Sequence, residues 1–474
     1  MKLGRWRGLG VSPMPVLTPE QVRVVDSAAG DLDELIGRAG SVVARVAVDV
    51  LGGTYGRRVV VIAGPGNNGA DGRVAAARLK AAGVRVELVD PTVGLVGPAD
   101  LVIDAAFGTG LSRPYEPPQV DAGTPILAVD VPSGLDALTG ANLGALGATT
   151  TVTFGAPKRG MFFGDGPELC GQVVVADIGL DLAPAQIDTW LVDDGLAERV
   201  LPHRPRRAHK WSAAVRVVAG SPGMWGAAHL TSSAAMRAGS GMVVVSGAGD
   251  AIPDGLPVEV VARSADDQAG AAPADARERA ARVAADLDRF GSLVLGPGLG
   301  RDQDEFVDAL VALSPVPTVI DADGLGFAWG RPEVLRRAGG PAIVTPHDGE
   351  FAKLVGRPPG PDRVGECREL ATRSGAVVLL KGPTTVVASP TGASWLVTAG
   401  DQRLATAGSG DVLSGMLGAV LAQLRPDADD VDQVALTVAC AAHWHGSTCD
   451  HLAAGTVASD IVDALARTRS GWRP

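Results

Sequence analysis

Short apolar runs that end in glycine-rich polar turns recur along this chain, and they constrain its fold more than any other feature. Strands that are apolar on both faces are typical of parallel sheets covered by helices. Several of the turns lead into segments with helical periodicity, so the pattern predicts an α/β fold. The apolar runs occupy residues 59–63, 101–104, 126–131, 215–219, 242–246, 293–296, 316–320, 343–344 and 377–380.

The length of the chain predicts more than one domain. At 474 residues it is too long for one ordinary hydrophobic core. Residues 201–207, Leu-Pro-His-Arg-Pro-Arg-Arg, are basic and broken by prolines, which is typical of a linker. We therefore expect a disordered tail at 1–15, a first domain over 16–200 and a second domain over 201–474.

The charge balance disfavours two classes of partner. The formal net charge is −11, and no basic run alternates with aromatic residues, so we expect neither nucleic acid nor a membrane surface as a partner. No apolar run approaches the ~20 residues of a membrane-spanning helix. The cysteines show no pairing pattern, which is typical of reduced thiols in the cytoplasm. They are Cys170, Cys367, Cys440 and Cys449.

Polar side chains follow three successive apolar runs in the first half. The turn after residues 59–63 reads Gly-Pro-Gly-Asn-Asn-Gly-Ala-Asp-Gly, and Asp104 and Asp130 close the next two runs. Ligands of open parallel sheets bind beyond the carboxyl ends of the strands. Oxygen-bearing side chains at such a place suit a ribose, a polar ring or a hard cation, although each one singly is also a common turn former. The residues expected to meet in one crevice are Asn68, Asp104, Asp130 and Ser133.

In the second half, a loop of small residues leads directly into a helical pattern. Residues 406–411 read Thr-Ala-Gly-Ser-Gly-Asp, and apolar residues follow with the 3.6-residue period of a helix face. The backbone N–H groups at such a helix start form an anion site, usually for phosphate. Asp411 would repel a phosphate, so we interpret it as a group that accepts a proton or faces a reacting hydroxyl. The alternative is a carboxylate that only complements the helix dipole.

Two further strand ends carry residues that suit a nucleotide site. His347 follows residues 343–344, and Lys381 follows residues 377–380. A single histidine in a turn more often makes local hydrogen bonds than does chemistry, and Lys381 is compatible with either a phosphate contact or a surface charge. Together with the loop that holds Asp411, they outline a nucleotide site with one acid.

A cluster of cysteines and histidines near the C-terminus has almost the spacing of a zinc site. However, residues 434–444 are predicted to form a buried helix, on which Cys440 and His445 would point about 140° apart. We therefore interpret the cluster as part of a core helix with apolar cysteines. Its members are Cys440, His443, His445 and Cys449.

The motifs of the first half indicate a family. Gly-x-Gly-Asn-Asn-Gly-x-Asp-Gly, Asp-Ala-x-Phe-Gly-Thr-Gly-Leu and Asp-Val-Pro-Ser-Gly-Leu-Asp occur in this order and resemble the NAD(P)H-hydrate epimerases over roughly residues 17–180. The resemblance implies a Rossmann-like three-layer α/β/α domain and a potassium ion held by Asn68, Asp104 and Ser133. Ala70 stands where the family usually has glycine, and we expect it to be tolerated. The implied hydrate contacts are Asn67, Asn68, Gly69, Ala70, Asp71, Gly108, Thr109, Gly110, Leu111, Ser112, Arg113, Pro114 and Asp130.

The motifs of the second half indicate another family. Thr-Pro-His-x-Gly-Glu, Leu-Lys-Gly-x-x-Thr and Ala-Gly-Ser-Gly-Asp resemble the ADP-dependent NAD(P)H-hydrate dehydratases, of ribokinase-like fold, over roughly residues 200–470. The resemblance implies that Asp411 meets the reacting hydroxyl and that Ala227, Gly298 and His347 also contact the hydrate. The implied nucleotide contacts are Lys381, Gly382, Pro383, Thr384, Thr385 and Gly410, to which we add Gly408 and Ser409 of the same loop.

Both resemblances together imply a bifunctional repair enzyme for hydrated nicotinamide cofactors, NADHX and NADPHX. The first domain would interconvert the R and S epimers with K⁺ bound and Asp130 as acid or base. The second would dehydrate the S epimer with ADP and Mg²⁺, giving AMP and phosphate. The alternative is a ribokinase-like kinase of a small molecule, joined to an N-terminal domain that only binds a ligand. We also expect a homo-oligomer.

Overall fold

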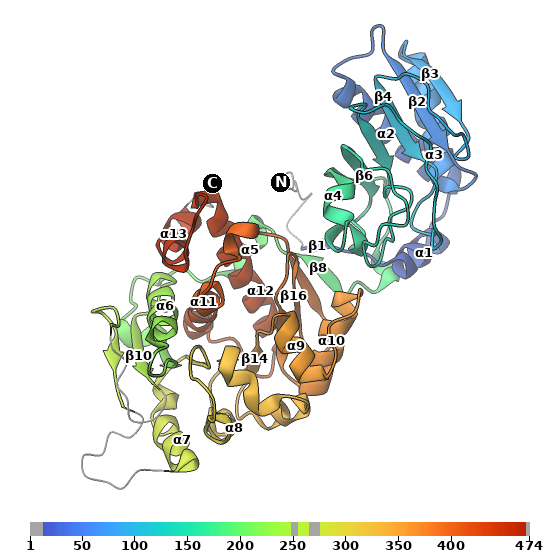
Figure 1. Ribbon diagram of the computed structural model, residues 1–474. Coiled ribbons are helices and arrows are strands. Elements are labelled where there is room, and N and C mark those ends of the chain that lie inside the picture. The colour runs from blue at the N-terminus through green and yellow to red at the C-terminus, as the bar shows by residue number, and fades with distance from the viewer. Residues whose placement is uncertain (1–12, 248–254, 265–274, 471–474) are drawn as a thin grey trace. The chain divides into compact units, whose positions relative to one another are not determined.

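The computed structural model describes residues 13–247, 255–264 and 275–470 (Figure 1). The chain divides into two compact units, Met1–Trp190 and Leu191–Pro474, and each contains a largely parallel sheet covered by helices. Of the tail expected at 1–15, residues 1–12 lie outside the described residues, and Met14–Pro15 forms the short strand β1.

The first unit is built on a parallel sheet with the strand order β3-β2-β4-β5-β6-β7. Helices α2 and α3 pack together on one face, over a core that includes Val59 and Val61. Val60 and Val102 face a second apolar cluster on the other side, as expected for strands buried on both faces. The elements are α1 (Pro19–Ala28), α2 (Leu32–Leu51), β2 (Arg58–Ala63), α3 (Asn67–Ala81), β3 (Arg85–Val89), β4 (Leu101–Ala105), β5 (Ile126–Val129), β6 (Thr150–Phe154), α4 (Gly166–Cys170) and β7 (Gln172–Ala176), and β8 (Thr189–Leu191) spans the boundary between the units.

The strand order of this sheet reverses between β2 and β4. The chain runs from β2 through α3 to the edge strand β3, and it then returns to β4 on the other side of β2. Ligands of open parallel sheets bind at such a reversal, beyond the carboxyl ends of the strands. The turns after β2 and β4 are therefore placed to form one binding site.

Helix α3 begins earlier than the sequence pattern indicates. We expected a helix only over residues 73–82, but α3 runs over Asn67–Ala81. Gly69 lies against Gly64, where a Cβ atom would overlap the Gly64 carbonyl oxygen, so tertiary packing overrides the low helix propensity of glycine. Ala70 lies inside this helix without a positive φ, so it replaces a glycine without backbone strain.

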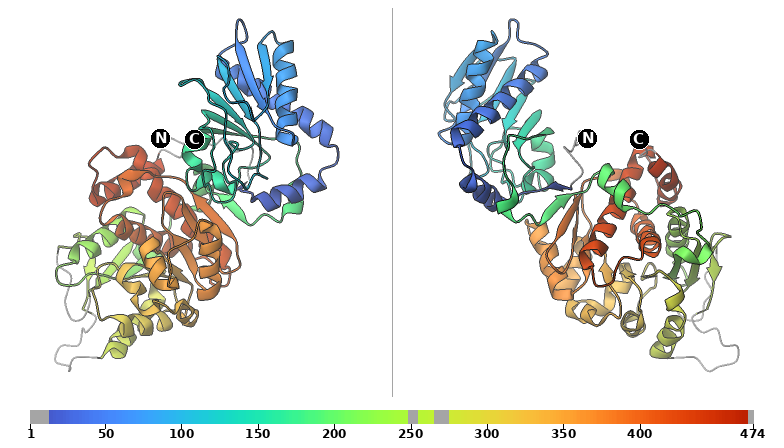
Figure 2. Two further views of the ribbon diagram at one scale, coloured as in Figure 1. Left: turned by 45° about the vertical axis from the view of Figure 1, so that its right-hand side comes forward. Right: turned by 180° about the vertical axis from the view of Figure 1, so that it is seen from behind.

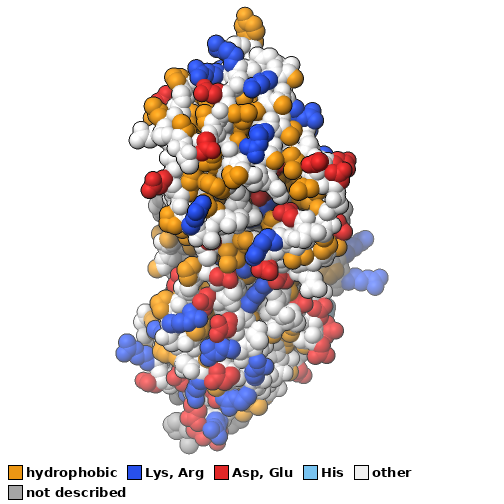
Figure 3. All heavy atoms as spheres, turned by 90° about the vertical axis from the view of Figure 1, so that its right-hand side faces the viewer, with side chains coloured by type: hydrophobic (Ala, Val, Ile, Leu, Met, Phe, Trp, Pro, Cys, Tyr) orange, Lys and Arg blue, Asp and Glu red, His pale blue; other side chains and the backbone are white. Residues whose placement is uncertain are grey.

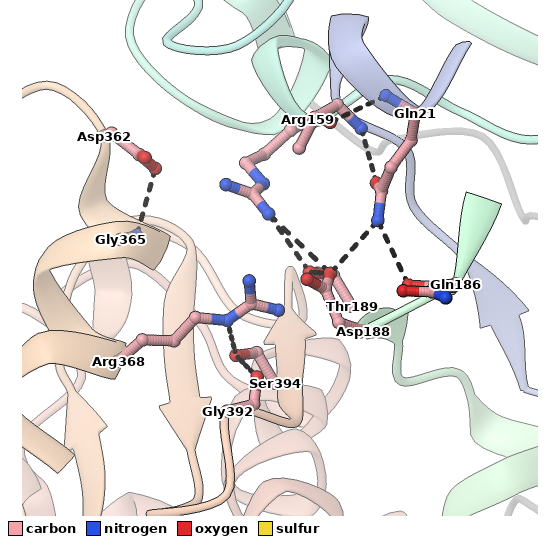
Figure 4. A network of polar contacts seen from close by, with 11 residues as sticks. Gln21, Arg159, Gln186, Asp188, Thr189, Asp362, Gly365, Arg368, Gly392 and Ser394 are labelled. Atoms are coloured by element: carbon pink, nitrogen blue, oxygen red, sulfur yellow. Dashed lines mark hydrogen bonds and ion pairs between the residues drawn. The ribbon is translucent and has the colours of Figure 1, made fainter. Parts of the chain in front are cut away.

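A polar network anchors the start of α1 in this unit (Figure 4). Thr18 and Gln21 form a capping box: Thr18 Oγ1 accepts from the Gln21 backbone N–H at 3.1 Å, and Gln21 Oε1 accepts from the Thr18 N–H at 2.9 Å. Gln21 Nε2 lies 3.5 Å from Asp188 Oδ1. The buried Arg159 donates to Thr189 Oγ1 at 3.3 Å. Helix α1 is therefore held by contacts from several segments that are distant in sequence.

The second unit contains a larger sheet, in the order β17-β16-β15-β14-β13-β12-β9-β10-β11. Among these described strands, β16 pairs antiparallel with both β15 and β17, and the other pairings are parallel. Helices α6, α11 and α12 pack together on one face, and α7, α8 and α10 cover the other (Figures 1 and 2). The elements are α5 (Asp194–Val200), β9 (Ala214–Val218), α6 (Trp225–Arg237), β10 (Met242–Ser246), β11 (Val261–Ala262), α7 (Ala276–Ala284), β12 (Ser292–Leu295), α8 (Asp304–Leu313), β13 (Thr318–Ile320), β14 (Ala342–Val344), α9 (Asp348–Val355), α10 (Arg363–Ser374), β15 (Val377–Leu380), β16 (Thr385–Ala388), β17 (Ser394–Val397), α11 (Ser409–Leu424), α12 (Val431–Ser447) and α13 (Ala458–Ser470).

Helix α11 is buried along most of its length and carries the loop of Asp411 at its start. The apolar helix face expected after Asp411 is confirmed, because Val412 and Met416 are fully buried. Gly415 lies against α6, where a Cβ atom would overlap the carbonyl oxygen of Thr231. Since only glycine allows this approach, the crossing of the two helices fixes the position of the α11 N-terminus.

The buried helix expected at residues 434–444 is confirmed as α12. All four cysteines are buried free thiols. His443 Nε2 lies 2.8 Å from Asp194 Oδ1, whereas His445 Nε2 lies 3.5 Å from Ser409 Oγ. The two imidazoles therefore contact different parts of the unit.

Charged side chains of both signs are interspersed on the face shown in Figure 3. The formal net charge of −11 is therefore not gathered into one patch on that face. Among the described residues, no helix is both long enough and apolar enough to cross a membrane.

The close crossing of α11 and α6 can be tested with Gly415→Ala. The added methyl group must displace backbone, so we expect the free energy of unfolding to fall by about 1–3 kcal/mol. Gly226→Ala is the matched control, because a Cβ at this α6 position meets no atom within 4 Å, and alanine there should add about 0.5–1 kcal/mol. Denaturant unfolding measures both, and a Gly415→Ala protein as stable as the parent would contradict the packing.

Candidate active sites

The predicted potassium ligands meet beyond the carboxyl ends of β2, β4 and β5. Asp104, at the end of β4, accepts hydrogen bonds from the Ser133 N–H at 2.8 Å and the Ser133 hydroxyl at 2.6 Å. Asn68, in the first turn of α3, donates its amide to the Phe107 carbonyl oxygen at 2.9 Å, and the Ser133 hydroxyl lies 3.0 Å from the same oxygen. The three side chains therefore surround one point, with a backbone carbonyl among them.

The atoms at this point suit a hard cation. Carboxylate, amide, hydroxyl and carbonyl oxygens are the ligands that such cations prefer. Asp104 is fully buried, and among the described residues it forms no ion pair. Burial raises the pKa of Asp104, although hydrogen bonds from Ser133 and Ala106 oppose this. A bound cation would supply the positive charge that this carboxylate lacks.

Asp130 follows β5 directly and is paired with the buried Lys158. Its backbone has φ 64°, in the left-handed region that Asp tolerates better than most residues. Its Oδ1 accepts from Lys158 Nζ and, at 3.2 Å, from the Thr153 hydroxyl. Only 2% of the Lys158 side chain is exposed, and its ammonium also donates to Thr153 Oγ1 at 2.8 Å and to the Phe154 carbonyl at 3.3 Å. These bonds fix the orientation of the Asp130 side chain.

Two further carboxyl groups lie in the same cavity, which has a volume of about 670 Å³. Burial, together with the negative charges of Asp130 and Asp26, raises the pKa of Asp71 to about 8. Burial and Asp130 also raise the pKa of Asp26, which comes from α1, while Lys158 lowers it. Near neutral pH, Asp71 is therefore mostly protonated, whereas Asp130 accepts hydrogen bonds from a lysine and a hydroxyl group.

Most of the predicted hydrate contacts line this cavity. Gly69 instead packs on the Gly64 backbone, and Ala70 and Pro114 lie outside the lining. The predicted residues that line it are Asn67, Asn68, Asp71, Gly108, Thr109, Gly110, Leu111, Ser112, Arg113 and Asp130.

The sequence reasoning missed Lys158 and Asp26 as residues of this site. Lys158 follows Pro157 just beyond a buried strand, and the adjacent charges Lys158 and Arg159 in an otherwise apolar segment were the available signal. Asp26 lies on α1 with no motif around it, so only the packing of α1 over the cavity places it there.

The second unit has its own strand reversal, between β9 and β12. Two predicted hydrate contacts meet there: a Cβ atom on Gly298, which has φ +63°, would lie 2.8 Å from the Ala227 methyl group. The loop after β12 continues to Gly300, whose N–H donates to Asp323 Oδ2 at 2.9 Å. The turns after β9 and β12 thus pack closely beside the acidic residues that follow β13.

Asp411 lies in the first turn of α11, next to a buried ion pair. Gly408, with φ +90°, is the N-cap, and the backbone N–H groups of the first turn have no partners within the helix. Lys381 Nζ lies 2.9 Å from Asp321 Oδ1, and the Ser414 hydroxyl donates to Asp321 Oδ2 at 2.7 Å. A Cβ atom on Gly410 would lie 3.6 Å from both Asp321 and Lys381. The helix start therefore faces this charged pair directly.

Burial and neighbouring charges shift the pKa values of Asp411 and Lys381. Burial, reinforced by Asp321 and Asp323, raises the pKa of Asp411 to about 6, although Lys381 lowers it. Burial opposes ionisation of Lys381, but Asp321, Glu350 and Asp411 outweigh this and raise its pKa. Asp411 is therefore a stronger base than an ordinary carboxylate, and it lies beside a cationic lysine.

The remaining predicted residues frame the same ion pair. His347 caps α9: its Nδ1 accepts from the Gly349 N–H at 3.0 Å, which leaves the proton of the neutral ring on Nε2. Glu350 Oε2 accepts from the His347 N–H and lies 3.8 Å from Lys381 Nζ. The predicted nucleotide residues form the turn between β15 and β16 and the start of α11. They are Lys381, Gly382, Pro383, Thr384 and Thr385, and Gly408, Ser409 and Gly410.

Comparison with known proteins covers both units. The family model described as NAD(P)H-hydrate dehydratase matches residues 215–469, and the model described as YjeF-related protein N-terminus matches residues 32–94 and 87–160. The Bifunctional NAD(P)H-hydrate repair enzyme Nnr of Mycobacterium tuberculosis is 39% identical over 407 residues, with 80% of this chain and 81% of that protein covered. The protein of the same name from Gloeobacter violaceus is 35% identical, with 92% of each chain covered. A crystal structure of an ADP/ATP-dependent NAD(P)H-hydrate dehydratase from Bacillus subtilis, co-crystallised with ATP/Mg²⁺, is 28% identical, covers 59% of this chain and 98% of its own, and has a TM-score of 0.47.

The fold and these comparisons define a two-domain α/β enzyme. The chain belongs to the family of bifunctional NAD(P)H-hydrate repair enzymes. The predicted α/β fold in two domains is confirmed, because each unit contains a largely parallel sheet covered by helices. Relatives that match both halves favour the repair enzyme over the alternative of a kinase with a non-catalytic N-terminal domain.

The ion pair in the first site can be tested with Lys158→Met. This change leaves the Asp130 carboxylate buried without its cation, so we expect the first unit to lose about 3–5 kcal/mol of stability. Hydrogen exchange of peptides from β5 and β6 reports the stability of this unit by itself. The double variant Lys158→Met/Asp130→Asn should regain part of the loss. A double variant as unstable as the single one would contradict the pairing.

Proposed function

We propose that the first domain, residues 16–200, interconverts the R and S epimers of NADHX and NADPHX, and that the second, residues 201–474, dehydrates the S epimer. The dehydration uses ADP and gives NAD(P)H, AMP and phosphate. The observation that carries this assignment is that each unit has a separate acid–base site at its own strand reversal. Relatives named for bifunctional NAD(P)H-hydrate repair match both halves of the chain.

In the first site, Asn68, Asp104 and Ser133 would hold K⁺. When bound, the ion would offset the charge of Asp104 and anchor the substrate near its phosphate groups. The hydrated ring would lie against the first turn of α3 and the loop of residues 108–114. Asp130 would face the carbon that bears the hydroxyl, because Lys158 holds its carboxylate toward the cavity.

The K⁺ assignment predicts that the two activities respond differently to monovalent cations. Replacing K⁺ with tetramethylammonium, which is too large for the site, should slow epimer exchange but leave dehydration of the pure S epimer unchanged. Asp104→Asn should lower exchange at a fixed K⁺ concentration at least ~10-fold. Chromatography of the two epimers in the absence of ADP measures exchange by itself. Equal exchange rates with and without K⁺ would contradict the assignment.

In the second site, Asp411 would accept the proton of the ring hydroxyl as its oxygen attacks the β-phosphorus of ADP, and AMP leaves. The backbone N–H groups of Gly408, Ser409 and Gly410 and the Lys381 ammonium would stabilise the phosphoryl group in transfer. Mg²⁺, when bound, would neutralise charge on the phosphates of ADP. The lone pair of the ring nitrogen then expels phosphate, and loss of a ring proton gives the reduced nicotinamide.

The role of Asp411 predicts both a mutational and a pH effect. Asp411→Asn removes the proton acceptor, so dehydration should fall at least ~10²-fold. Because the base must be ionised and the pKa of Asp411 is raised to about 6, the wild-type rate should rise with pH through about 6 and then level off. Dehydration of the S epimer, followed by absorbance of the reduced nicotinamide, measures both effects. Asp429→Asn, which changes an exposed carboxylate of the same unit, is the control, and an unchanged Asp411→Asn rate would refute the role.

We further propose that the protein acts in the cytoplasm, which the four unpaired thiols support. A homo-oligomeric state and the absence of nucleic-acid and membrane partners stay predictions.

A further inference from the structure

Two carboxyl groups in the cavity of the first unit have opposite surroundings. Asp130 accepts from Lys158 and Thr153. Asp71 comes from the second turn of α3 and is only 7% exposed, yet among the described residues its side chain has no hydrogen-bond or ion-pair partner. Both side chains line the cavity. A buried, unpartnered carboxyl group beside an ionised one is unfavourable as an anion, because each negative charge raises the cost of the other.

The charged groups around Asp71 are of both signs, and the buried cation of the cavity, Lys158, is already engaged. Lys158 donates to Asp130, Thr153 and Phe154. Asp26 and Asp130 raise the pKa of Asp71 in addition to burial, so that Asp71 retains its proton at neutral pH. The α2 residues that line the cavity are apolar and do not offset these charges. The other charged side chains near the cavity are Arg23, Asp104 and Arg113.

We propose that Asp71 is a second catalytic residue of the epimerase site, which donates a proton to the reacting hydrate while Asp130 accepts one. This inference rests on the proposed epimerase function of the first domain. It differs from a binding role, because a group that only held the hydrate could be replaced by an amide without loss of the chemical step. Lys158 and Thr153 are positioning residues, because they hold the Asp130 carboxylate in place as the proton acceptor.

Both groups take part in the proton balance of the proposed reaction, whichever bond breaks. In ring opening, Asp130 takes the hydroxyl proton as the carbon–nitrogen bond breaks, its electron pair stays on nitrogen, and nitrogen takes the proton of Asp71. Rotation of the aldehyde and the reverse steps close the ring on the other face and return both protons. In water loss, Asp71 protonates the leaving hydroxyl and the nitrogen lone pair forms the C=N bond. Water then adds to the other face, Asp130 takes its proton, and transfer to Asp71 restores the site.

The test uses Asp71→Asn in the full-length protein, with purified R epimer and no ADP, and follows the S epimer by chromatography. Asparagine keeps the shape of the side chain but cannot donate an acidic proton, so exchange should fall ~10²-fold or more with little change in KM. Asp49→Asn, an exposed carboxyl group on the neighbouring helix α2, is the matched control and should exchange at the wild-type rate. Asp71→Glu should restore part of the activity.

The pH profile separates a catalytic from a structural role. Wild-type exchange should decline as the pH rises through about 8, where Asp71 loses its proton, and this decline should vanish in the residual activity of Asp71→Asn and return in Asp71→Glu. Asp71→Asn exchange at the wild-type rate, or an unaltered alkaline decline, would overturn the inference. Absence of exchange above the spontaneous rate in the wild-type protein would instead refute the proposed function. Dehydration of the S epimer by the same variant shows that the second domain is intact.

Discussion

Burial of carboxyl groups is the constraint on which both sites depend. An ionised carboxylate in a protein interior costs several kcal/mol unless a cation or several hydrogen bonds compensate it. This chain buries such groups at the carboxyl ends of its parallel strands and compensates them in different ways. Asp321 has Lys381 and Ser414, Asp130 has Lys158 and Thr153, and Asp104 has only the Ser133 and Ala106 donors. The compensation that each group receives decides its chemistry.

The same arrangement occurs on two different sheets. In each unit, a buried lysine pairs with one aspartate, and a second carboxyl group nearby has a raised pKa: Asp71 in the first unit and Asp411 in the second. The pKa values of about 8 and about 6 suit opposite roles, because near neutral pH the first group is mostly protonated and the second mostly ionised. Burial and two neighbouring carboxyl groups raise the pKa of both groups, but the Lys381 cation lowers that of Asp411 and offsets part of the effect.

Some of this could be predicted from the sequence because it depends on local pattern. Apolar runs marked the strands, and the residues after Asp411 marked a helix that the structure confirms. The convergence of Asn68, Asp104 and Ser133 followed from the rule for strand ends in parallel sheets.

What could not be predicted depends on contacts between distant segments. The start of α3 at Asn67 is set by the approach of Gly69 to the Gly64 backbone, which the helix propensity of these residues does not reveal. Lys158 belongs to the first site because it follows β6 and its ammonium group donates to Asp130. Asp26 belongs to the site because α1 packs over the cavity. Neither position carries a local signal of function, since burial and charge pairing arise only in the folded chain.

The most direct test of the account is the recovery of reduced nicotinamide from an equilibrium mixture of both NADPH-hydrate epimers, with ADP, Mg²⁺ and K⁺ present. Absorbance of the reduced ring reports the product continuously. If each domain performs its assigned step, nearly all of the hydrate is recovered, and the R fraction is consumed faster than it epimerises spontaneously. Recovery of the S fraction alone would contradict an epimerase in the first domain, and no recovery at all would contradict the dehydratase in the second.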